Sequence, residues 1–174
     1  MIEQDPHNAK PTLFTKLFKA QDEDRLDFDE IRDTAQVYIV AGSDTTAHTL
    51  TYLVWAVCRN VGIRDRLVRE VQVLPSDFSD RELSQLSYHG HVIDEALRLY
   101  CAAPSGLPRT VPPEGARLAG YWIPGGIAVC SQAYSLHRDP EIFPQPDVFN
   151  PSRWGDATRP MREAFMPFGG GARG

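Results

Sequence analysis

The chain has 174 residues, of which 42% are hydrophobic and 24% charged, and its formal net charge at pH 7 is −5. This length is sufficient for one domain with its own hydrophobic core. The acidic balance is opposite to the basic stripe that marks a nucleic-acid-binding surface, so we expect no nucleic-acid partner. The three cysteines form no C-x-x-C pair, which is typical of a reducing compartment and predicts no disulfide.

The N-terminal residues are polar, with a short amphipathic turn predicted over residues 13–18. The sequence shows neither a targeting segment nor an apolar run long enough to cross a membrane, so we expect the chain as it stands to be soluble. Asp27 followed by Glu30 has the spacing of a capping box. Apolar residues then recur with a helical period, and the pattern predicts one helix over residues 27–58, roughly 45 Å long.

Shorter elements are predicted next. A polar helix is expected over residues 64–74, before Pro75, and Ser79 with Glu82 forms a second capping-box pattern. Residues 88–101 predict a further helix before Pro104. Residues 104–135 predict a β-rich segment, with a hairpin of residues 118–123 and 127–132 around a turn at 124–126. Prolines at positions 140, 144, 146 and 151 predict an irregular meander within residues 136–174.

Asp44 and Thr45 are polar residues in the middle of the long apolar helix. Such residues are costly to bury unless they are hydrogen-bonded, and a threonine hydroxyl can bond to the carbonyl four residues earlier. One interpretation is a satisfied pair on a solvated face. The other is a ligand groove, which Gly42 in the same turn favours because glycine is unfavourable in a helix by about 1 kcal/mol.

Glu95 and Arg98 are three residues apart, so they share a helix face and can form an ion pair. An exposed pair of this kind would contribute only about 0.2–1 kcal/mol. The mostly apolar flanks of the motif favour a partly buried pair instead.

The chain ends with Phe168-Gly169-Gly170-Gly171-Ala172-Arg173-Gly174. A segment so rich in glycine fits a flexible tail, and it lacks the G-K-[ST] ending of a phosphate-binding loop. A third interpretation, a cofactor loop, depends on three motifs upstream. These are Ala41-Gly42-Ser43-Asp44-Thr45-Thr46, Glu95-Ala96-Leu97-Arg98 and Phe149-Asn150-Pro151-Ser152-Arg153-Trp154.

The four ordered motifs together resemble the cytochrome P450 haem-thiolate monooxygenases, in the style of fungal members, from about residue 27 onward. The resemblance implies a mainly α fold with small β-hairpins, of the α+β class, present here as a C-terminal-half fragment that stops just before the axial cysteine. Because that cysteine would follow Gly174, we expect no metal ligand within the chain.

The resemblance also implies roles for individual residues. Asp44 and Thr45 would be catalytic and relay protons to dioxygen. Glu95, Arg98 and Arg153 would form a structural triad behind the haem. The expected cofactor-binding residues are Ala41, Gly42, Arg109, Phe168 and Arg173, the two arginines against the propionates of haem b.

The activity implied is insertion of one atom of dioxygen into a small organic substrate, with electrons from NADPH through a cytochrome reductase. A full-length relative would sit on the endoplasmic reticulum membrane through an anchor absent from this chain. The alternative is a non-catalytic truncated fragment, arising from a gene-model artefact, a pseudogene or an interaction fragment. On either interpretation we expect the isolated chain to be inactive.

Other candidate ligands have structural roles on this interpretation. Cys58, Cys101 and Cys130 lack the glycine loop, and free cysteines in apolar surroundings usually belong to the core. The pair His89 and His91 cannot place both rings on one helical face, so we expect no metal site there. His137 is expected to be a structural, hydrogen-bonded histidine.

Overall fold

The computed structural model describes residues 12, 15 and 27–170, and it divides the chain into two units, residues 1–44 and 45–174. Apart from Thr15, the turn expected at residues 13–18 lies outside the described residues. Within the described part the fold is mainly helical, with two small antiparallel sheets. This confirms the expected α+β class.

The longest helix is α2 (Phe28–Arg59), whose residues up to Asp44 belong to the first unit and whose later residues belong to the second. Its start is a capping box, as predicted. The Glu30 backbone N–H donates to Asp27 Oδ1 at 2.8 Å, and the Asp27 N–H donates to Glu30 Oε2 at 2.9 Å. Among the described helices, none has the length and apolar character of a membrane span.

Helix α3 (Val61–Val71) begins three residues before the predicted start. A single residue, Asn60, separates it from α2 and serves both helices. Its side chain donates to the Ala56 carbonyl at 2.7 Å, and its extended backbone begins α3. Asn60 alone therefore connects the two helices.

Helix α4 (Asp80–Ser84) has the capping box predicted from Ser79 and Glu82. Helix α5 (Ser87–Tyr100) follows it, and its N-cap residue makes no side-chain capping bond. Glu70 of α3 supplies that bond instead. Its two carboxylate oxygens accept from the backbone N–H groups of Tyr88 at 2.8 Å and His89 at 2.7 Å, where a helix N-terminus favours negative charge.

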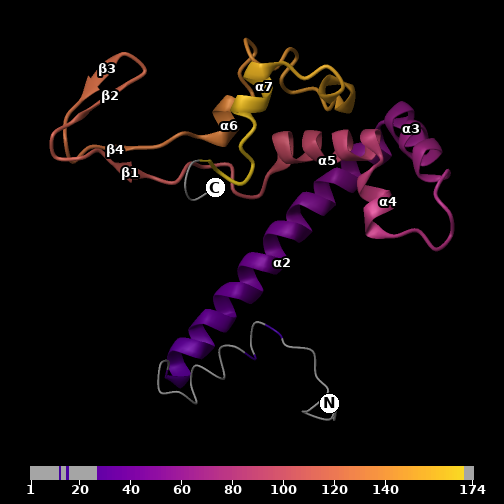
Figure 1. Cartoon of the computed structure of the whole chain (residues 1–174), viewed down its shortest axis with the longest axis horizontal. Coiled ribbons are helices and arrows are strands. Elements are labelled where there is room, and N and C mark those ends of the chain that lie inside the picture. Colours follow the sequence, from indigo (N-terminus) through magenta and orange to yellow (C-terminus); the bar gives the residue numbers. More distant parts are fainter. Residues whose placement is uncertain (1–11, 13–14, 16–26, 171–174) are drawn as a thin grey trace. The chain divides into compact units, whose positions relative to one another are not determined.

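The main hydrophobic core of the second unit lies between the end of α2 and the buried face of α5. Its buried members are Ala56, Val57, Tyr88, Val92, Ala96, Leu99 and Phe149. The helices α3 and α4, together with the 3-10 helix η1 (Pro151–Trp154), also pack against α5 (Figure 1). Helix α5 is therefore the element around which this unit is organised.

The sheets differ from the predicted hairpin. Strand β2 (Ala116–Leu118) pairs with β3 (Tyr121–Ile123), and β1 (Arg109–Thr110) pairs with β4 (Ala128–Val129). The predicted pairing of residues 118–123 with 127–132 is wrong. The reversal occurs at Ala119 and Gly120, which both have positive φ, as a two-residue hairpin turn requires.

The meander is irregular, as its prolines predict. After α6 (Ala133–Leu136) it contains only η1 and α7 (Arg159–Ala164) as regular elements within the described residues. A second small core holds it together through Phe143, Trp154, Met161 and Ala164.

Candidate functional site

One large cavity lies within the second unit, with a volume of about 1250 Å³. Its walls come from α2, from the half-buried Ile93 and Leu97 of α5, from the segment between α5 and β1, from residues within 118–133, and from residues 166–170. The lining is mainly apolar, and representative residues are Leu50, Leu53, Ile93, Leu97, Leu107 and Phe168. A space of this size exceeds the 300–1,000 Å³ of ordinary small-molecule pockets, so it suits a large apolar ligand.

The α2 wall of the cavity carries three threonines, Thr45, Thr46 and Thr49. The Thr49 hydroxyl donates to the Thr45 carbonyl at 3.1 Å, which is the bond to the residue four earlier that polar helical residues often make. The threonines therefore place hydroxyl groups on an otherwise apolar wall without disrupting the helix.

The preceding turn of α2, with Ala41, Gly42 and Asp44, belongs to the first unit. A Cβ added at Gly42 would meet no described atom within 4 Å. Packing against described parts of the chain therefore does not require glycine at this position.

Glu95 and Arg98 are both fully buried on α5 and joined by two hydrogen bonds of 2.9 Å. Arg153, from η1, donates through Nε to the same carboxylate at 3.0 Å. The structure thus brings together the three residues that the sequence assigned to a triad. Arg98 also donates to the carbonyls of His137, Pro146 and Val148, so that all five of its N–H groups are used.

Two further donors to Glu95 were missed by sequence reasoning. The Trp154 indole N–H donates to Glu95 Oε2 at 3.0 Å, and the Asn150 backbone N–H donates to Oε1 at 2.9 Å. A buried tryptophan N–H usually finds a partner, so Trp154 next to Arg153 was a usable signal. No signal in the sequence indicates the Asn150 backbone contact.

His137 has no exposed surface and is hydrogen-bonded at both ring nitrogens. Its Nδ1 lies 3.0 Å from the Arg98 carbonyl oxygen, and its Nε2 accepts from the Met166 backbone N–H at 2.9 Å. Burial lowers the pKa of this imidazole, and the Arg98 and Arg138 charges lower it further, while the bond to the Arg98 backbone opposes the shift. The ring is therefore neutral at pH 7.

The remaining predicted cofactor-binding residues have different positions. Arg109, at the start of β1, is one of the residues that line the cavity, and its side chain donates to the Leu107 and Pro108 carbonyls at 3.3 and 3.0 Å. Phe168 also lines the cavity and is 78% exposed. Arg173 lies outside the described residues.

The cysteines do not all follow the expectation. Cys58 and Cys130 are exposed, so the core assignment is wrong for them, whereas Cys101 is buried. Burial raises the pKa of the Cys101 thiol, and a protonated thiol is a poor metal ligand. In the part of the chain that the structure describes, no group of three or more His, Cys, Asp or Glu residues could hold a metal ion.

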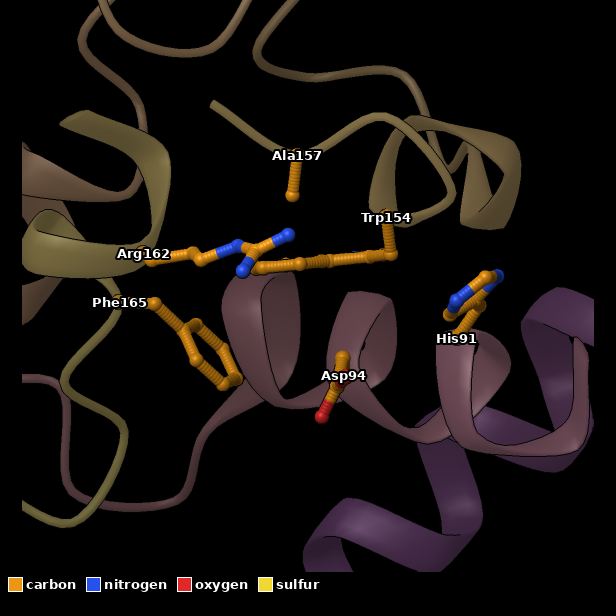
Figure 2. Close-up of a pocket in the computed structure, with 6 residues that line it drawn as sticks. All are labelled: His91, Asp94, Trp154, Ala157, Arg162 and Phe165. Carbon is orange, nitrogen blue, oxygen red and sulfur yellow. The ribbon is translucent and has the colours of Figure 1, made fainter. Parts of the chain in front are cut away.

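A smaller cavity of about 310 Å³ lies between α5, η1 and α7. Figure 2 shows the side chains that line it, with Asp94 and His91 on α5 and the Trp154 ring next to Phe165 and Arg162. Burial raises the pKa of the Asp94 carboxyl, and the nearby His91 partly offsets this increase. This carboxyl is half-buried next to the fully buried Glu95, whose charge also raises its pKa.

The described part of the chain is thus a mainly helical fold with a large, mainly apolar cavity and a buried ion-pair network. Residues 3–174 match the family model for cytochrome P450. The cytochrome P450 monooxygenase orf2 of Aspergillus niger is 50% identical over 172 residues, covering 99% of this chain and 35% of that protein. The cytochrome P450 monooxygenase tazI of Aspergillus terreus is 61% identical over 145 residues, covering 83% of this chain and 30% of that protein.

A solved structure agrees with these sequence relatives. A cyanobacterial cytochrome P450 with retinoic acid bound is similar with a TM-score of 0.73 and 27% identity, over 86% of this chain and 35% of that one. The chain therefore belongs to the cytochrome P450 family, which confirms the resemblance drawn from the four motifs. It spans about a third of the length of the curated relatives.

Membership of this family implies haem, and the residues present fit such a group. The cavity is large and mainly apolar, as a porphyrin requires. Arg109 is one of the lining residues, and guanidinium groups suit carboxylates such as haem propionates. No carboxylate lines the cavity among the described residues to oppose those propionates.

Proposed function

We propose that residues 45–170 provide one side of the haem site of a monooxygenase. The observation that carries the proposal is the cavity of about 1250 Å³, bounded by the threonines of α2 on one side and by the start of the glycine loop on another. The cofactor proposed is haem b, which when bound activates dioxygen for insertion of one oxygen atom into a small organic substrate.

Proton delivery is assigned to the side chains of Asp44 and Thr45. A carboxylate and a hydroxyl in succession can pass a proton along hydrogen bonds, and Thr45 lies on the cavity lining. Ala41 and Gly42, one turn earlier in the sequence, are proposed to leave the space in which oxygen binds.

The propionates are assigned to Arg109 and Arg173, and one face of the porphyrin to Phe168. Arg109 and Phe168 are supported by their places on the cavity lining. Arg173 is supported by its place in the sequence motif alone. Glu95, Arg98 and Arg153 are proposed to support the meander behind the cofactor, and their buried network favours that structural role.

The oxygen-insertion activity is proposed for a protein of the length of its relatives. Its partners would be a small organic substrate and an NADPH–cytochrome reductase. Its location would be the endoplasmic reticulum membrane.

Haem titration of the 174-residue chain tests the proposed cavity. Saturable binding of ferric haem, followed by visible absorbance, is the expected result. Arg109→Gln should weaken binding about three- to tenfold, because a partly exposed charge-assisted bond is lost. The matched control is Arg117→Gln. Arg117 lies on strand β2 but is not one of the residues that line the cavity, so this variant should bind haem like the unmodified chain. Non-saturating binding, or equal weakening by both variants, would remove the haem assignment.

A further inference from the structure

We propose that His137 is a positioning residue, which fixes the segment 166–170 against α5 so that this segment forms its wall of the large cavity. The inference deepens the proposed function and rests on it, because that wall is where we place the haem. The ring bridges two elements through hydrogen bonds to the Arg98 carbonyl on α5 and to the Met166 backbone N–H.

The hydrogen bonds determine the tautomer of the ring. A backbone N–H can only donate, so Nε2 must accept from Met166 and carry no proton. The neutral ring then has its proton on Nδ1, which donates to the Arg98 carbonyl. A proton added at Nε2 would place two donors against each other, which would break the bond to Met166.

The surroundings of the ring favour the neutral form. The charged groups that face it are the guanidinium of Arg98 on α5 and that of Arg138 on the adjoining segment. Phe143 from the meander and Phe165 after α7 contact it with uncharged rings, at centroid distances of 6.3 and 5.6 Å. The pKa of the imidazole therefore lies below its usual value of about 6.5, and the ring is a neutral bridge at pH 7.

Met166 transmits this constraint to the cavity. While its N–H is held by His137, its carbonyl accepts from the Gly169 N–H at 3.1 Å and so closes a turn. Gly169 has φ of 89° in that turn, a conformation that glycine adopts readily. Residues 166–170 all line the cavity, so the bond to His137 sets the position of this wall relative to Leu97 on α5.

Two substitutions separate the two bonds. His137→Asn keeps a donor near the position of Nδ1 and loses the acceptor at Nε2. His137→Gln keeps an acceptor near Nε2 and loses the donor at Nδ1. Both remove aromatic volume from the same buried site, so a purely structural role predicts the same effect for both.

The test uses the full 174-residue chain labelled with ¹⁵N and free of haem. Hydrogen exchange of the Met166 amide should be protected in the unmodified chain and in His137→Gln, and about tenfold or more faster in His137→Asn. The control His91→Asn, on α5 but lining the smaller cavity, should leave Met166 unchanged. Imidazole ¹⁵N shifts should show the proton on Nδ1, and Met166 protection should fall as acid protonates the ring.

Several results would overturn the assignment. These are a proton on Nε2, equal Met166 exchange in the two His137 variants, or loss of exchange protection throughout α5 in both, which would make His137 a packing residue only. Because no haem is present, failure here is distinct from failure of the haem titration. If the chain binds haem but Met166 exchanges equally in both His137 variants, the proposed function stands and the positioning role of His137 is wrong.

Discussion

Replacing Glu95 by glutamine should strongly destabilise the chain. The Glu95 carboxylate is fully buried and accepts five hydrogen bonds, two from Arg98 and one each from Asn150, Arg153 and Trp154. The substitution keeps the shape of the side chain. It removes the negative charge that compensates two arginines and replaces one acceptor oxygen by a donor.

The size of the loss follows from where the amide group must point. With the glutamine oxygen at the Oε1 position, the bonds from Arg98 Nη2, Asn150 and Arg153 survive. The new NH₂ group then faces the N–H groups of Arg98 Nε and Trp154. Two buried donors without acceptors cost about 1–3 kcal/mol each, which agrees with the loss of about 3–5 kcal/mol typical of a broken buried ion pair. A domain of ordinary stability, about 5–15 kcal/mol, would lose a large share.

Urea unfolding at pH 7 measures this effect. For a slope of about 2 kcal/mol per molar urea, the transition midpoint of Glu95→Gln should fall by roughly 2 M. The control is Glu163→Gln, in the exposed pair with Arg159, which should change stability by less than about 1 kcal/mol. If the two variants have similar midpoints, the buried network does not stabilise the fold.

Three other substitutions give distinct outcomes. Glu70→Ala should destabilise the chain by about 1–2 kcal/mol in urea, because α5 loses the carboxylate that caps its N-terminus; no change would mean that water replaces that cap fully. The raised pKa of Asp94 means that the folded state holds a proton where the unfolded state has lost it, so this residue's stabilising contribution is present at low pH and is lost as pH rises through the folded pKa. Asp94→Asn should therefore raise the urea midpoint at pH 7 with little gain near pH 3, and an equal gain at both values would contradict the pKa argument. In a haem-loaded protein of the length of the relatives, Thr45→Ala should keep haem but divert NADPH electrons to hydrogen peroxide, and an unchanged ratio of product to NADPH consumed would remove Thr45 from proton delivery.

The sequence predicts best what depends on neighbours along the chain. The capping boxes at Asp27 and Ser79 follow from residues three apart, as does the pairing of Glu95 with Arg98. The α5 cap could not be predicted in this way, because Glu70 lies 18 residues from Tyr88 and no local pattern joins them.

The hairpin was misplaced for a related reason. The strands have only two or three residues each, too short for alternation to identify them, and three candidate turn residues at 124–126 outweighed Gly120. The glycine at position 120 was the informative residue, because glycine readily adopts the positive φ that the turn has there. Burial of Trp154 against Glu95 likewise depends on contacts between residues 59 apart, which spacing along the chain does not reveal.

Two arginine side chains supply several backbone carbonyls of the proline-rich meander with hydrogen-bond donors, and this affects the order in which the chain folds. Pro144 and Pro146 have no N–H group, so their segment cannot complete a ladder with another strand. Arg98 and Arg153 supply donors to the carbonyls of Pro144, Gln145, Pro146 and Val148. The Gln145 carbonyl also accepts from the Val148 N–H, but the Pro146 carbonyl gains its Arg98 partner only after α5 has formed, and Arg153 is held by a carboxylate 58 residues away in sequence. Since contacts of such long range form slowly, the meander should dock late in folding and as a single cooperative step.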